Sequence, residues 1–230
     1  MTSIHFFHKI LFFFGFNNAK EKTTKLLLLS CTFSMLLLAT RICVTGSLFY
    51  LFLVWNLFLA FIPFFATNFM ERLTESGSKK RFWFLFLTWL LFIPNSFYII
   101  TDLFHLDEGY KAPQWFDLAL LFSFAWNGLL IGIISLRQME KLITRYLPTK
   151  WRNVFLHAVL FLNAIGIYIG RYLRYNSWDI IANPLQLTKD ILYLCFHPLR
   201  NFNDWGMIVC FTLLMAFIYH SFRSFSHELP

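Results

Sequence analysis

The sequence predicts an all-α membrane protein, a polytopic bundle of about six transmembrane helices. Hydrophobic residues make up 58% of the 230 residues and charged residues only 14%, whereas a typical soluble domain carries about 25% charged residues. The apolar residues occur in long runs, and a helix needs roughly 20 such residues to cross a bilayer. Lys and Arg lie mostly between these runs. A chain of this composition lacks the polar surface of a soluble domain.

One amino-terminal segment and one transmembrane domain are expected. Residues 1–25 are rich in Phe and Lys, and their apolar core is too short to span a bilayer. Because they lack the small-residue cleavage site of a signal peptide, we expect an interfacial segment there. Residues 26–230 are expected to form the transmembrane domain. Its predicted spans are residues 26–45, 48–68, 82–100, 114–136, 153–170 and 205–222.

Individual residues mark the ends and irregularities of these spans. Gly46 suits a tight turn after the first span, where Arg41 is expected to snorkel toward the headgroups. Pro94 lies in the distal half of the third span and is expected to kink it. Pro113 suits the first turn of the fourth. Residues 180–203 hold an apolar run that is too short to span, so we expect this segment to lie at the interface or to re-enter it.

The distribution of positive charge orients the bundle. Fourteen of the 20 Lys and Arg residues fall on the side that holds both termini and residues 71–81 and 137–152. The positive-inside rule places this side, and therefore both termini, in the cytoplasm. The net charge of +8 is distributed as an orientation signal rather than as a phosphate-binding patch. We therefore expect membrane lipids as partners and no nucleic acid.

Two polar clusters fall on the predicted outer side, one after the third span and one after the fifth. The candidate binding residues are Asp102, His105, Asp107, Arg171, Arg174, Asn176 and Asp179.

Asp102 and His105 are the candidates for chemistry. They are three residues apart, so they share one face of a helical turn. This spacing suits two metal ligands, or a carboxylate that orients an imidazole acting as a general base. A metal site usually needs at least three ligands, however. The alternative is a helix-terminal aspartate followed by a solvated acidic loop over residues 101–111, and the sequence leaves both open.

Arg171 and Arg174 also share a helical face. They can snorkel, pair with Asp102, or hold an anionic lipid or another phosphate-bearing ligand at the outer face. Because the acidic and basic clusters are predicted at one depth, we expect Asp102 to meet these arginines.

Small and amide residues inside the spans indicate helix contacts. Gly128 with Gly132, and Gly166 with Gly170, fit the small-residue pattern of close helix approach. The fourth and fifth spans run in opposite directions, so the two motifs lie at opposite depths. Each motif is expected to admit a different neighbour.

Three asparagines, Asn56, Asn127 and Asn163, lie near the middle of their spans. They could line a polar conduit or form hydrogen bonds between helices, and their lack of charge favours hydrogen bonds.

Two long motifs resemble the DUF1361 family. They are IPNSFYIITDLFHL, residues 93–106, and GRYLRYNSWD, residues 170–179; residues 50–56, YLFLVWN, extend the similarity. The resemblance covers residues 26–222 and implies a bacterial integral membrane protein of unknown function, hence a multi-pass protein of the cytoplasmic membrane. It supplies no substrate, cofactor or catalytic residue.

Two classes of function stay open. The first is a binding, transport or structural protein with an outer-face polar site of Asp, His and Arg residues, which the lack of known catalytic signatures favours. The alternative is a membrane-embedded enzyme acting on lipid or cell-envelope intermediates at the outer leaflet, which the density of these residues favours. The sequence determines neither a cofactor nor an oligomeric state.

Overall fold

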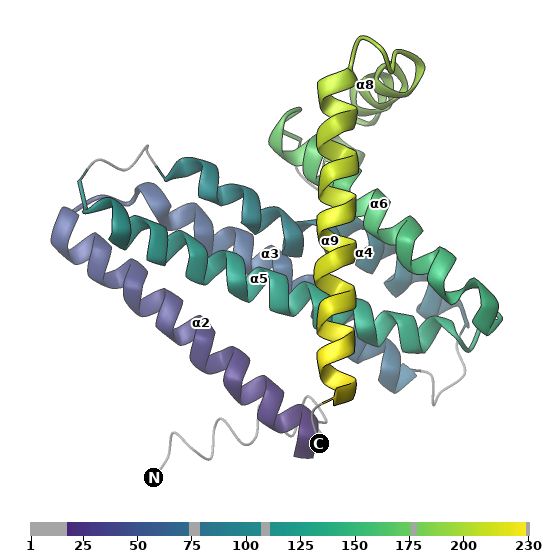
Figure 1. Cartoon of the computed structure of the whole chain (residues 1–230), viewed down its shortest axis with the longest axis horizontal. Coiled ribbons are helices and arrows are strands. Elements are labelled where there is room, and N and C mark those ends of the chain that lie inside the picture. Colours follow the sequence, from purple (N-terminus) through teal and green to yellow (C-terminus); the bar gives the residue numbers. More distant parts are fainter. Residues whose placement is uncertain (1–17, 74–78, 107–110, 176–178, 229–230) are drawn as a thin grey trace.

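The computed structural model describes residues 18–73, 79–106, 111–175 and 179–228, and the elements within them are all helices, without a strand (Figure 1). The α-helices are α2 (Asn18–Thr45), α3 (Phe52–Leu73), α4 (Lys79–Tyr98), α5 (Gln114–Ile143), α6 (Arg152–Arg171), α7 (Asp179–Ala182), α8 (Pro184–Phe196) and α9 (Phe202–Glu228). The short 3-10 helices η1 (Phe49–Leu51) and η3 (Thr149–Trp151) precede α3 and α6, and η2 (Ile99–His105) continues α4.

Among the described residues, six helical segments are long and apolar enough to cross a membrane. They are Thr23–Thr45, Phe49–Arg72, Lys79–His105, Gln114–Ile143, Thr149–Arg171 and Phe202–Ser224. Each contains most or all of one predicted run, so the prediction of an all-α polytopic bundle is confirmed. Residues 1–17 of the expected interfacial segment lie outside the described residues, and α2 begins at Asn18 within that segment. The short helix α8 is not among the six.

α4 lies at the centre of the bundle. It packs against α3, α5 and α6, whereas α2 contacts α5 and α9 contacts α6. In Figure 1, α2 lies along one edge, and α9 crosses the direction of α5. Buried apolar side chains form one cluster around Trp89 and Phe97 and another around Tyr50 and Phe124. Because lipid is as apolar as these side chains, close packing and polar contacts hold such helices together.

One face of α4 lies against the glycines of α5. A Cβ atom on Gly128 would lie 2.7 Å from the carbonyl oxygen of Ser96, and one on Gly132 would lie 3.0 Å from the ring of Phe97. The Ser96 hydroxyl also donates to the carbonyl of Ala60 in α3, at 3.0 Å. Only glycine leaves room for backbones to approach this closely.

The glycines of α6 lie against the same segment of α4. A Cβ atom on Gly166 would lie 2.7 Å from the ring of Pro94, and one on Gly170 would lie 3.2 Å from the ring of Tyr98. The two glycine motifs therefore do not pair with each other, as expected. The expectation that they lie at opposite depths is wrong, because both lie against residues 94–98 of α4. The expectation of two different neighbours is wrong, because residues 94–98 of α4 fill both.

The expected loop after the third span begins later than predicted. α4 continues through Pro94 to Tyr98, and residues 99–105 then tighten into η2. The amide of Asn95 donates to the carbonyl of Phe92, at 3.1 Å. The first half of the predicted acidic loop is therefore helical.

The connection after α2 turns at Gly46, as predicted. Gly46 has a φ of +63°, in the region that glycine adopts without steric cost. Its N–H donates to the carbonyl of Ile42 at 2.8 Å, which closes the last turn of α2.

Arg41 does not snorkel, so that expectation is wrong. Its Nε and Nη2 atoms donate to the Oδ1 and Oδ2 atoms of Asp117 at 2.7 and 3.1 Å. The two side chains are only 1% and 2% exposed. The guanidinium also lies 4.3 Å from the ring centroid of Tyr50. A bidentate carboxylate at the start of α5 satisfies the arginine inside the protein, so it need not reach the headgroups.

The mid-span asparagines point into the bundle. Asn127 donates to the hydroxyl of Ser34 and Asn56 donates to Asp102, both at 2.8 Å. These two contacts confirm hydrogen bonding between helices. Asn163 is buried as well, and neither of its side-chain polar atoms has a hydrogen-bond partner among the described residues.

Candidate functional site

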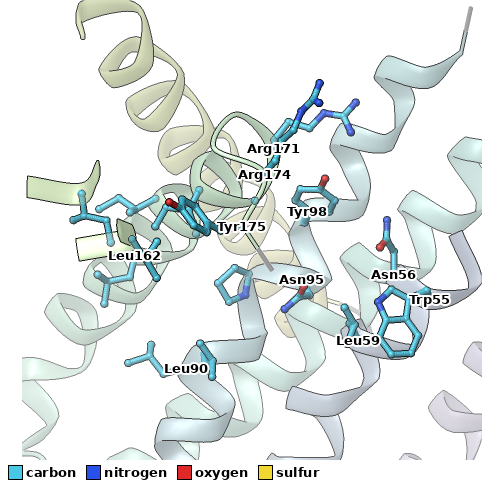
Figure 2. A pocket seen from close by; sticks show the side chains of 18 of the residues that line it. Trp55, Asn56, Leu59, Leu90, Asn95, Tyr98, Leu162, Arg171, Arg174 and Tyr175 are labelled. Carbon is cyan, nitrogen blue, oxygen red and sulfur yellow. The ribbon is translucent and has the colours of Figure 1, made fainter. Parts of the chain in front are cut away.

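A cavity of about 910 Å³ lies between α3, α4, α6 and α8. We call it the upper cavity, because α8, which forms part of its wall, lies near the top of Figure 1. Its walls along α4 and α6 are apolar and consist mainly of Leu and Ile side chains, among them Leu90 and Leu162. Figure 2 shows Arg171 and Arg174 away from these two leucines, at the other end of the cavity. Leu187 of α8 completes the wall.

The polarity of the cavity follows from the direction of its helices. α4 runs toward Tyr98 and η2, and α6 runs toward Arg171, so both helices end at the same side. Their central turns are apolar because they lie at the depth of the hydrocarbon core, and their last turns carry the polar groups. The cavity is therefore apolar toward mid-span and polar toward one end of the bundle.

Asp102 lies behind the polar end of the cavity. Its side chain is 1% exposed. Asp102 is not among the described residues that line the cavity. The amide of Asn56 donates to Asp102 Oδ2 at 2.8 Å. Arg171 Nη1 lies 3.9 Å from Asp102 Oδ1. The expected meeting of the two clusters is therefore confirmed, and the arginine that makes it is Arg171.

His105 joins the same group from the next turn of η2. Residues three apart are eclipsed on a 3-10 helix, so His105 and Asp102 face the same guanidinium. Arg171 Nη1 lies 2.9 Å from His105 Nε2. A guanidinium only donates, so Nε2 is the acceptor in this contact. The hydroxyl of Tyr50 donates to the carbonyl of His105, at 2.9 Å.

A metal does not suit Asp102 and His105 in this arrangement. Arg171 occupies the position between them, so a cation of the protein already meets both side chains. Within the described residues, no group of three or more His, Cys, Asp or Glu side chains could hold a metal ion. Three ligands are the usual minimum.

Arg174 lines the cavity and is exposed. Among the described residues it has no hydrogen-bond or ion-pair partner. Its φ of 58° lies in the left-handed region, which non-glycine residues rarely adopt and which costs roughly 1–2 kcal/mol. Such a backbone persists where the surrounding structure holds it, and it is often found at functional sites.

Tyr175 connects the end of α6 to α8. Its hydroxyl donates to Asp190 Oδ2 at 2.8 Å. This hydrogen bond stabilises the protonated phenol and raises the pKa of Tyr175. The link holds α8 beside the cavity, where Leu187 and Ile191 form part of the wall.

Three predicted site residues remain. Asp107 and Asn176 lie outside the described residues. Asp179 begins α7 and does not line the cavity within the described residues. Asn95 and Tyr98 line the cavity and are not among the predicted site residues, although both lie in the motif of residues 93–106. Asn56 also lines the cavity; the sequence favours a hydrogen bond between helices for it, although residues 50–56 carry part of the family resemblance.

Comparison with known proteins gives one positive result. A family model described as "Protein of unknown function (DUF1361)" matches residues 55–218. No curated protein and no solved structure is found to match. The matched residues cover well over half of the chain and contain both long motifs, α4 to α8 and all of the residues that line the upper cavity. The chain therefore belongs to the DUF1361 family of proteins of unknown function.

Proposed function

We propose that this multi-pass membrane protein binds an amphiphile that carries an anionic group, such as an anionic lipid or a lipid-linked phosphate. The upper cavity carries the proposal, because it joins an apolar wall to a polar end that holds two arginines. Its volume of about 910 Å³ falls within the usual size range of ligand pockets. A lipid tail suits the mid-span part, and a charged head suits the arginines.

The two arginines support different parts of this proposal. Asp102 and His105 hold Arg171, so its guanidinium is positioned before a ligand arrives. Arg174 is exposed to the cavity with its charge uncompensated by a described residue. An arginine presents a planar fork of donors that matches a phosphate or carboxylate. A preorganised arginine beside an uncompensated one is a suitable receptor for an anion.

The proposed location is a bacterial cytoplasmic membrane, with both termini in the cytoplasm and the polar end of the upper cavity at the outer leaflet. The excess of Lys and Arg at the opposite end supports this orientation. The six apolar helices support a membrane location. The ligand would then enter from the outer leaflet.

The enzyme alternative receives less support from the geometry. A general base must reach the proton that it removes. Asp102 lies behind the cavity wall, and Arg171 already engages His105 Nε2. Acid–base chemistry by this pair would require Arg171 to move first.

The test is retention of an anionic lipid by the purified protein, counted by native mass spectrometry. We expect phosphatidylglycerol to be retained in preference to phosphatidylcholine. Arg174→Gly should weaken this retention about tenfold, because a charge-assisted hydrogen bond contributes about 1.5–3 kcal/mol. Glycine suits the left-handed backbone at this position, so the variant should keep the melting temperature of the wild type.

Lys189→Gln is the matched control, because it removes one positive charge from an exposed position of α8 that does not line the cavity. It should leave retention unchanged. If Arg174→Gly and Lys189→Gln reduced lipid retention equally, retention would depend only on the surface charge of the protein, and the proposal would be wrong.

A further inference from the structure

A second, smaller cavity lies at the opposite end of the bundle. Its volume is about 230 Å³, and its lining side chains are all polar: Arg137, Glu140, Lys141, Thr144, Arg152 and Arg223. They come from the end of α5, the start of α6 and the end of α9. Arg152 and Arg171 stand at the two ends of α6, about 30 Å apart by helix length. This lower cavity is therefore distinct from the upper one.

Cationic side chains predominate in the lower cavity. Among the described residues that line it, Arg137, Lys141, Arg152 and Arg223 are cationic and Glu140 is the one acid. Glu140 is itself nine-tenths buried. Its Oε1 atom forms an ion pair with Arg152 Nε at 3.1 Å and accepts from Arg223 Nη1 at 3.4 Å, and its Oε2 atom accepts from the Tyr219 hydroxyl. Both carboxylate oxygens are thus engaged.

Glu140 orients the cations toward a further ligand. Arg152 uses only its Nε atom in the contact with Glu140, and its two Nη groups have no partner among the described residues. Lys141 is exposed in the cavity and has no described side-chain partner. Arginine and lysine donors that converge in a small polar cavity suit the oxygens of a phosphate. Basic pockets between transmembrane helices are known to bind lipid headgroups.

We propose that the lower cavity binds a phosphate group, either in the headgroup of an anionic lipid or in a soluble phosphate. A bound phosphate would accept from Lys141 and from the Nη groups of Arg152, and would connect α5 with α6. The cavity has no apolar wall, so a lipid would insert its headgroup alone and leave its tails outside. This proposal does not depend on what the upper cavity binds.

The test uses the full chain in nanodiscs of phosphatidylcholine and measures its melting temperature. One arm adds phosphatidylglycerol to the nanodisc, and the other adds inorganic phosphate to the buffer. Stabilisation in the first arm alone that Lys141→Gln lowers assigns the ligand as a lipid headgroup, and stabilisation in the second arm that Lys141→Gln lowers assigns a soluble phosphate. Stabilisation in neither arm would overturn the proposal.

Lys141→Gln is the informative variant, because the Lys141 side chain is exposed and has no hydrogen-bond or ion-pair partner among the described residues, so its loss should not disturb the fold. It should weaken apparent affinity about tenfold. Lys150→Gln removes one charge from an exposed residue at the same end, outside the cavity, and should change nothing. The difference between Lys141→Gln and Lys150→Gln should also appear in an Arg174→Gly background, which separates this site from the upper cavity. Equal losses of apparent affinity in the two lysine variants would also overturn the proposal.

Discussion

At the scale of single residues, Arg171 organises the polar end of the upper cavity. It reaches the buried carboxylate of Asp102, the imidazole of His105 and, at 5.1 Å, the ring of Phe104. Arg171 is only 15% exposed, and Asp102 is 1% exposed. Removal of either side chain would leave the other charge in a poorly solvated position.

The pairing can be measured with a double-mutant cycle. Asp102→Asn and Arg171→Gln should each lower the free energy of unfolding by about 1–4 kcal/mol, because each leaves a partly buried charge without its partner. The double variant should lose less than the sum of the two, as expected for residues in contact. Thermal or denaturant unfolding in detergent gives the values. Losses that simply add would show that the two charges are not coupled.

At the scale of elements, α4 is held between α5 and α6 by glycines on both sides. Pro94 and Tyr98 lie against the α6 motif, and Ser96 and Phe97 lie against the α5 motif. Residues 94–98 therefore cannot shift along either neighbour without a steric clash. η2, which carries Asp102 and His105, continues directly from this held segment, so the glycines position the site.

Alanine at these glycines should destabilise the bundle. Gly128→Ala would push against the backbone of Ser96, which cannot rotate away, and should cost about 1–3 kcal/mol. Gly166→Ala would push against the Pro94 ring and should cost a similar amount. Melting temperatures in detergent would show the effect.

Gly206→Ala in α9 is the control, because no atom lies within 4 Å of its added Cβ. Alanine is the better helix former by about 1 kcal/mol, so this variant should be neutral or slightly stabilised. If Gly206→Ala lowered the melting temperature as much as Gly128→Ala, close packing of α4 against the glycines would not be the cause of the loss.

At the scale of the whole molecule, the two cavities lie at opposite ends of a bundle with an asymmetric charge distribution. The upper cavity opens where η2 and α6 end, and the lower cavity opens where α5 and α9 end. If the basic end is cytoplasmic, the two proposed anion sites serve different leaflets. The orientation of the bundle therefore decides which leaflet supplies each ligand.

Cysteine labelling tests this orientation. Lys111→Cys and Thr149→Cys occupy exposed positions at opposite ends of α5. In a background without the four native cysteines, a membrane-impermeant maleimide should label position 111 in intact cells and position 149 only after lysis. This follows from the positive-inside rule. Labelling of position 149 alone in intact cells would reverse the proposed topology.

The sequence alone determined the class of the protein, its six spans and its family. Membrane helices must be long and apolar because lipid offers no hydrogen bonds to the backbone, and this property can be read directly along the chain. The motif of residues 93–106 also identified the stretch around which the helices pack. Spacing alone placed Asp102 and His105 on one face.

Only the tertiary structure decided which side chains meet. It paired Asp102 with Arg171, buried Arg41 against Asp117, and placed Glu140 between Arg152 and Arg223. It also showed that both glycine motifs pack against α4. Such pairings depend on how each helix is rotated about its axis and which neighbours it has. Hydropathy gives the depth of a residue in the membrane, but it carries no information about direction within the membrane plane.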